Sequence, residues 1–174
     1  MPTSRRVNRT GTGDGSAFRR EKQNCPQFPC PPFPLYNRGV DVLITPEAGK
    51  AIEALPVFRP EPGAWGVLIG HRRGPRVIVE GIALGGGAGR APDAGTLAGF
   101  DRIWPGRVVG LAAVRPGAAF KRAVLGPAWY GKLVLTVSGR SPARAVRPQV
   151  VEFERRFFLA PARLAPAGKE DPHE

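Results

Sequence analysis

Apolar residues along the chain gather in short runs separated by glycine- and proline-rich segments, and the period of each run predicts its structure. Residues 40–44 (VDVLI) form a short, β-branched run that is typical of a strand. A helix is expected next, because Thr45 offers a cap oxygen, Pro46 a fixed φ and Glu47 an early acid. Apolar positions at helical spacing extend this helix to about Leu55, where Pro56 is expected to end it.

The middle of the chain predicts a hairpin, a second helix and a central strand. Residues 65–71 (WGVLIGH) and 76–84 (RVIVEGIAL) are two apolar runs joined by RRGP, which is typical of a β-hairpin. Residues 93–104 begin at an acidic cap and place apolar side chains at helical spacing. Residues 107–115 (RVVGLAAVR) are apolar throughout, so we expect a strand that is covered on both faces.

Three further strands are predicted at residues 132–138, 143–147 and 150–158, the last because its apolar and polar residues alternate. The predicted fold class is therefore α/β (α+β), with a single mixed sheet of about six to seven strands flanked by two or three helices. We expect a disordered, basic, proline-rich N-terminal arm at 1–37, a folded domain at 38–160 and a flexible tail at 161–174.

Composition limits the function without fixing it. The net charge of +12 would attract nucleic acid, anionic lipid or an acidic protein. Arginine in the company of abundant alanine, glycine and proline is equally typical of GC-rich coding. No apolar run approaches the roughly 20 residues of a membrane span, and no secretory signal opens the chain, so a cytoplasmic protein is expected.

Candidate metal and nucleotide sites are weak in this sequence. Cys25 and Cys30 would need two more ligands for structural zinc, and His71 and His173 are the only histidines. Unpaired thiols in a reducing compartment are expected, with a local disulfide as the open alternative. The run 85–92 (GGGAGRAP) lacks the glycine spacing of a phosphate-binding loop and is interpreted as a linker. No cofactor is predicted.

The order of elements over residues 40–158 resembles the JAB/MPN family, the fold of JAMM zinc metallopeptidases that remove ubiquitin or ubiquitin-like tails. ITPEAGKAIEALP resembles the opening helix of that family, and GAWGVLIGH resembles its ETCGLLLGR-type strand. RVVGLAAVRPG resembles the strand that ends in VVGWYHSHP, and WYGKLVLTVSG a later strand. The resemblance implies an MPN/cytidine-deaminase-like architecture.

The resemblance also implies which positions would carry the family's chemistry, in which two His and one Asp bind zinc, a Glu accepts a proton and a Ser stabilises the oxyanion. Alignment on Gly66, Gly110 and Pro116 places non-ligands at all five positions: Gly63 for Glu, Ala113 and Arg115 for His, Ala123 for Ser, Gly126 for Asp. Since the chain between His71 and His173 contains no histidine, no shift of the alignment restores the site. A degenerate member without metal or enzymatic activity is expected.

Three functions remain open at this stage. The first is a pseudoenzyme that binds a protein partner, ubiquitin-like or otherwise acidic, with Arg115, Lys121 and Arg122 lining the vacated cleft; ordinary surface charge is the alternative for these residues. The second is a basic nucleic-acid-binding protein that uses its N-terminal arm, although no known nucleic-acid-binding signature is present. The third is an enzyme with another constellation, for which the candidates Glu61, Glu80, Asp101 and His71 show no recognised spacing.

Overall fold

The computed structural model describes residues 39–86, 89–138 and 146–165. The predicted arm, both cysteines, residues 143–145 of one predicted strand and residues 166–174 lie outside these ranges. The described strands are β1 (Asp41–Ile44), β2 (Trp65–Arg73), β3 (Arg76–Leu84), β4 (Val108–Val114), β5 (Leu133–Val137), β6 (Val146–Phe153), β7 (Phe157–Pro161) and β8 (Arg163–Leu164). The described helices are α1 (Pro46–Phe58), α2 (Ala94–Ile103), the short α3 (Ala118–Ala123) and a 3-10 turn, η1 (Pro127–Trp129).

The predicted fold class, a sheet of six to seven strands flanked by two or three helices in an MPN/cytidine-deaminase-like architecture, is wrong. The structure is mostly β, and its mixed sheet has eight described strands in the order β7-β6-β5-β4-β2-β3-β1-β8. β7 pairs with β6 and β8 pairs with β1, so the two ends of the order are consecutive in sequence. The N–H of Ala162 donates to the Pro148 carbonyl (3.1 Å) and that of Arg163 to the Val40 carbonyl (2.9 Å). One extended segment thus joins both edges of a nearly closed, barrel-like sheet.

The predicted strand at 150–158 is in fact the end of β6, a turn and the start of β7. The turn lies at Glu154–Arg156, where the N–H of Glu154 donates to the Arg156 carbonyl (3.3 Å). Because no glycine, proline or asparagine marks this turn, the alternation of polar and apolar residues runs straight through it. β7 and β8 also carry regular structure to Leu164, beyond the expected domain boundary at 160.

The first helix begins as the sequence predicts. The Thr45 hydroxyl accepts a hydrogen bond from the Ala48 N–H (3.3 Å), and Ala48, Ile52 and Leu55 are its buried residues. The predicted end was wrong, because α1 continues through Pro56 to Phe58. The proline falls in the last turn, where its missing N–H costs only one helical hydrogen bond.

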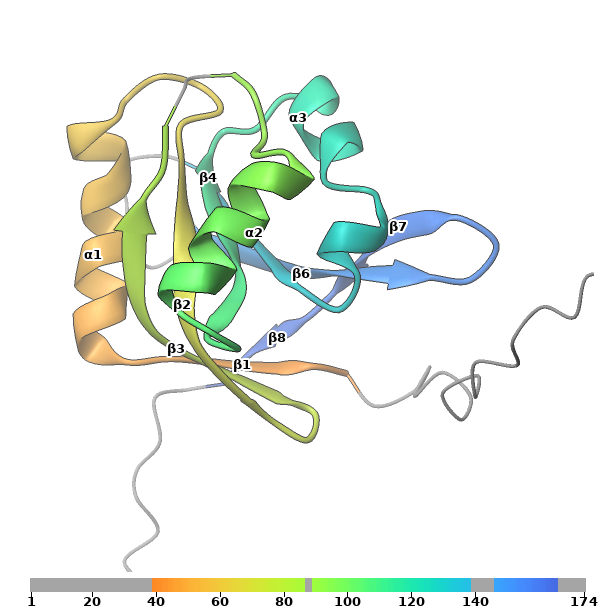
Figure 1. Cartoon of the computed structure of the whole chain (residues 1–174). Helices are drawn as coiled ribbons and strands as arrows, with labels where there is room; N and C mark the ends of the chain where they lie inside the picture. Colours follow the sequence, from red (N-terminus) through yellow and green to blue (C-terminus); the bar gives the residue numbers. More distant parts are fainter. Residues whose placement is uncertain (1–38, 87–88, 139–145, 166–174) are drawn as a thin grey trace, which may run out of the picture. The chain divides into compact units, whose positions relative to one another are not determined.

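The hairpin of β2 and β3 and the central position of β4 are confirmed. Gly74, with φ of 56°, and Pro75 form the turn of the hairpin, and β4 lies between β2 and β5. α1 and α2 lie on opposite sides of these strands (Figure 1). α1 packs with one buried cluster that includes Leu68 and Val79, whereas α2, α3 and η1 cover a second cluster that includes Val67 and Leu111. None of the described helices is long and apolar enough to cross a bilayer.

Candidate functional site

Trp65, the first residue of β2, is the centre of the candidate site. It pairs with Ala113 of β4, and side chains at paired positions lie on the same face of a sheet. Trp65 is 6% exposed and belongs to the same buried cluster as Ala113, Phe120 of α3 and Val124, the C-cap of α3. A large indole therefore lies beside the position that the resemblance assigns to a zinc-binding histidine.

Two aromatic rings, one from α2 and one from its C-cap residue, pack against this buried cluster. Phe100 meets Trp65 edge to face, with ring centroids 6.2 Å apart and planes at 77°. Trp104 stacks on Phe100 with centroids 6.0 Å apart and an interplanar angle of 12°. Such pairs add about 0.5–1.5 kcal/mol each beyond the burial of their area. The indole is thus held by packing from α2 as well as from the sheet.

The chain just after β3 forms another wall against the indole. The Gly85 N–H donates to the Trp65 carbonyl (3.1 Å), and a Cβ on Gly85 would lie about 2.1 Å from the Trp65 ring. Only glycine allows the backbone to approach the ring so closely. The glycine-rich run interpreted from the sequence as a linker therefore has a specific packing role at Gly85.

These elements enclose an open cleft of about 520 Å³. Its lining combines aromatic and apolar side chains, bare glycine backbone and three polar residues: Trp65, Leu84, Gly85, Gly86, Arg90, Ala91, Pro92, Asp93, Thr96 and Phe100. Leu84 is 56% exposed, so the cleft presents apolar surface to solvent. An apolar floor with a few polar groups is the usual composition of a ligand site.

Asp93 is both a lining residue and the N-cap of α2. Its carboxylate accepts a hydrogen bond of 2.7 Å from the Thr96 N–H. This bond to the Thr96 backbone lowers the pKa of Asp93 below its usual value, because the charged carboxylate is the better acceptor. Asp93 therefore stays negatively charged at neutral pH, and with Arg90 it gives the cleft one charge of each sign.

The structure gives local reasons why two of the five aligned catalytic positions are poor sites for ligands. Gly63 is buried with φ of 80°, and a Cβ there would lie 2.8 Å from backbone atoms of Gly89. A glutamate at Gly63 would be strained and would clash. Ala113 is fully buried beneath the indole cluster.

The remaining aligned positions lie at the end of β4 and beyond. Arg115 is exposed, has φ of 42° and donates to the Pro60 carbonyl (2.6 Å). Ala123 is the last residue of α3, and Gly126 is the N-cap of η1. In the described part of the chain, no group of three or more His, Cys, Asp or Glu could hold a metal ion.

The predicted binding residues do not line the cleft. Arg115 follows β4, whereas Lys121 and Arg122 lie in the last turn of α3, and none of the three is among the lining residues. Lys121 is half-buried and Arg122 is exposed. The sequence analysis did not identify Arg90, Asp93 or Phe100 as site residues. The signal that could have found the site is a tryptophan at the start of one strand and a glycine run directly after the next strand.

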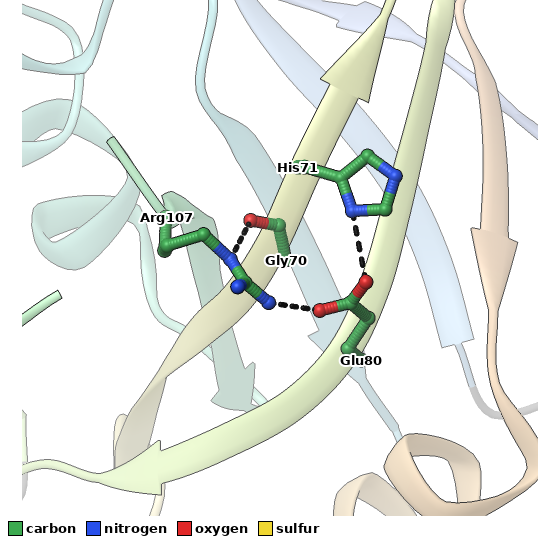
Figure 2. A network of polar contacts seen from close by, with 4 residues as sticks. All are labelled: Gly70, His71, Glu80 and Arg107. Atoms are coloured by element: carbon green, nitrogen blue, oxygen red, sulfur yellow. Dashed lines mark hydrogen bonds and ion pairs between the residues drawn. The ribbon is translucent and has the colours of Figure 1, made fainter. Parts of the chain in front are cut away.

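A second polar arrangement joins His71 and Glu80, whose spacing in the sequence did not predict a contact. His71 Nδ1 lies 2.8 Å from Glu80 Oε1, and the other Glu80 oxygen pairs with the Arg107 guanidinium (Figure 2). Arg107 Nε also donates to the Gly70 carbonyl at 3.0 Å. His71 Nε2 is shielded from solvent and has no hydrogen-bond partner among the described residues. Since no hydroxyl or thiol meets Nε2, the network fits a structural role better than nucleophilic catalysis.

The other candidates of that third hypothesis stay apart from this network. Glu61 lies in the loop between α1 and β2, where its carbonyl accepts from the Ala64 N–H (3.0 Å), and Asp101 lies in α2. Neither takes part in a described ion pair. The structure therefore brings together two of the four residues, His71 and Glu80.

The described part of the chain is a mostly β, single-sheet domain whose cleft is lined in part by the aromatic rings of Trp65 and Phe100. No protein-family model matches the sequence, and no curated protein matches it. Among solved structures, the chain is similar to the solution structure of protein DSY2949 from Desulfitobacterium hafniense, with a TM-score of 0.50 and 15% sequence identity. The match covers 77% of this chain and 99% of that one. At this identity the likeness concerns the fold alone.

Proposed function

We propose that the protein is a non-catalytic binding module, related to the JAB/MPN family, that holds an extended segment of a partner protein in the cleft beside Trp65. The observation that carries the proposal is the cleft lined by Trp65, Phe100 and Gly85, where aromatic rings lie next to bare backbone. Aromatic side chains set among a few polar groups are typical of the centres of protein interfaces. The proposed setting is the cytoplasm.

The preferred partner is acidic or ubiquitin-like, because the resemblance implies tail recognition and the protein carries a net charge of +12. Within the cleft, Arg90 is the group that would pair with a carboxylate of the bound segment. Asp93 would repel a second carboxylate at the α2 end and thereby favour one direction of binding. The residues at the five aligned positions support a role without catalysis, since none is a metal ligand or general base.

The first prediction tests this cleft with a photo-crosslinking amino acid at Leu84 in cells, followed by mass spectrometry and affinity measurement on the purified partner. Leu84 lines the cleft and is exposed, whereas Val57, at the end of α1 and 76% exposed, is the matched control. We expect Leu84, and not Val57, to crosslink one acidic or ubiquitin-like protein. Phe100→Ala and Arg90→Ala should each weaken its binding about tenfold or more, the loss typical of an interface anchor.

Two results would contradict the proposal. One is a crosslink pattern that is the same from Leu84 and Val57, or binding that Phe100→Ala and Arg90→Ala leave unchanged. The other is stoichiometric zinc in the purified protein together with cleavage of a ubiquitin-like fusion, which would make it an active isopeptidase. Lys50 is an exposed cation on α1, and Lys50→Ala serves as the control for a simple loss of positive charge.

A further inference from the structure

Three exposed arginines form a row across the end of the sheet opposite the cleft. Arg73 of β2 pairs in register with Arg76 of β3, Arg76 with Asp41 of β1, and Asp41 with Arg163 of β8. We call Arg73, Arg76 and Arg163 the arginine row. Since residues paired in register point to the same face, all three cations project from one surface.

The positive charge of the arginine row is largely uncompensated. Both described ion pairs go to Glu80, and Asp41 takes part in neither of them. The row thus holds three cations and one anion within three strand spacings, a width of about 14 Å. The exposed Arg72 is also nearby, on the opposite face of the hairpin end.

We propose that the arginine row binds the phosphodiester backbone of duplex nucleic acid without reading its sequence. About 14 Å of duplex carries about four phosphates on each strand, so three guanidinium groups in a line can each meet one. Guanidinium groups bind phosphate oxygens with paired donors, and such contacts fix a protein on the duplex without specifying bases. The net charge of +12 would favour the encounter.

A duplex fits this surface better than a single strand. Single-strand binding relies on exposed aromatic rings on which bases stack. The exposed aromatic residues of the described chain, Phe58, Tyr130 and Phe153, lie in α1, before β5 and in β6, and none is in a strand of the row. The row therefore supplies phosphate contacts without a stacking surface.

The site is separate from the cleft, and the two proposals can fail independently. Arg76 begins β3, and Leu84, which lines the cleft, ends it. Eight residue steps of a strand separate them by about 26 Å. The double variant Phe100→Ala/Arg90→Ala should therefore leave nucleic-acid binding unchanged, and changes in the arginine row should leave partner binding unchanged.

The test is a fluorescence anisotropy titration of the full chain with a labelled 20-base-pair DNA of arbitrary sequence, repeated from 50 to 300 mM salt. Each neutralised phosphate contributes about −0.9 to the slope of log affinity against log salt. The triple variant R73A/R76A/R163A should make that slope shallower by about 2–3 units and weaken binding by about eightfold per lost contact at 0.1 M salt. R73K/R76K/R163K should keep the slope, because the contact depends on charge.

The matched control is R122A/R155A/R156A, which removes three exposed arginines elsewhere and leaves the same net charge as the row variant. We expect this control to keep most of the wild-type slope. Equal losses in the two triple variants would overturn the proposal in favour of a diffuse charge effect. So would row-dependent binding that is found only with phosphatidylserine vesicles or polyglutamate, since those results would assign the surface to a membrane or an acidic protein.

Discussion

Gly70 shows how a single residue shapes the sheet around it. On one side Ile69 and Gly70 pair with Gly81 and Val79, so Glu80 is an extra residue in β3. On the other side the pairing of β2 with β4 is also irregular next to Gly70, at Leu68/Ile69. A bulge changes the direction of nearby side chains, so it can bring together side chains that regular pairing would keep apart. Here Glu80 is the bulged residue of β3 and also the residue that contacts His71. The spacing of the two residues in the sequence did not predict this contact.

The close backbone approach at this bulge requires glycine. A Cβ on Gly70 would lie 1.9 Å from the Ile78 carbonyl oxygen, which is a backbone atom and cannot rotate away. Gly70→Ala should therefore lower the free energy of unfolding by about 2–3 kcal/mol, the upper part of the range that is usual for overpacked core positions. Urea denaturation followed by circular dichroism would measure the change.

Gly81→Ala is the control for this substitution, because Gly81 lies in the paired strand and a Cβ there would meet no other atom within 4 Å. Its effect should stay within about 1 kcal/mol, since alanine only restricts the backbone. Equal destabilisation by the two substitutions would show that glycine is needed at both positions for backbone freedom and not for space at Gly70.

At the scale of elements, the sequence predicted where helices begin better than it predicted which of their residues are buried by tertiary packing. Asp93 caps α2 as its acidic start suggested, and Leu97 is the buried residue of that helix. Ile103, at helical spacing from Leu97 and Phe100, is 65% exposed, whereas Leu97 is buried and Phe100 meets Trp65. A periodic pattern identifies a face, but the tertiary partner decides how much of that face is covered.

The cap of α2 gives a pH-dependent prediction. Because the folded-state pKa of Asp93 is lowered, its stabilising effect is present above the unfolded pKa, near 3.8, and is lost as the pH falls through the folded value. Asp93→Ala should lower the thermal midpoint at pH 7, and the gap from wild type should shrink below pH 4. Asp93→Asn keeps an acceptor oxygen at every pH, so the difference in thermal midpoint between Asp93→Asn and Asp93→Ala should stay constant across the pH range.

Thermal unfolding at pH 7, 5 and 3 would check this pattern. Thr45→Ala, at the N-cap of α1, is the control, because a hydroxyl cap does not titrate and its loss should cost the same at each pH. A gap between wild type and Asp93→Ala that is unchanged at pH 3 would show that the carboxylate charge contributes nothing to the cap.

The candidate site was less predictable than the elements because it depends on contacts between distant segments. Trp65, Gly85 and Phe100 come from a strand, a loop and a helix, and each alone has an ordinary explanation in the sequence. Only the register of β2 against β4 places Trp65 opposite Ala113, and no local pattern encodes that register. The arginine row has the same origin, since Arg163 reaches it only through the pairing of β8 with β1.

At the scale of the whole molecule, the closure of the sheet depends on β8, although this last strand has only two residues. β8 pairs with β1 through hydrogen bonds that span a separation of more than 120 positions along the chain. The N–H of Ala165 donates to the Val42 carbonyl (2.9 Å), as that of Arg163 does to the Val40 carbonyl. Val42 is fully buried, so this closure protects a core strand that would otherwise be an edge. The sequence interpretation missed it because two residues before a polar tail carry no strand pattern.

This closure predicts different effects of proline at two neighbouring positions. Ala165→Pro removes the donor to Val42 and should lower the free energy of unfolding by about 1–3 kcal/mol. Leu164→Pro should cost clearly less, because alternation along the strand points the Leu164 N–H away from β1. Urea denaturation would measure both, and hydrogen exchange should show faster exchange in β1 for Ala165→Pro alone. If Leu164→Pro is as damaging as Ala165→Pro, the segment does not close the sheet through these hydrogen bonds, and the position of Arg163 in the arginine row loses its support.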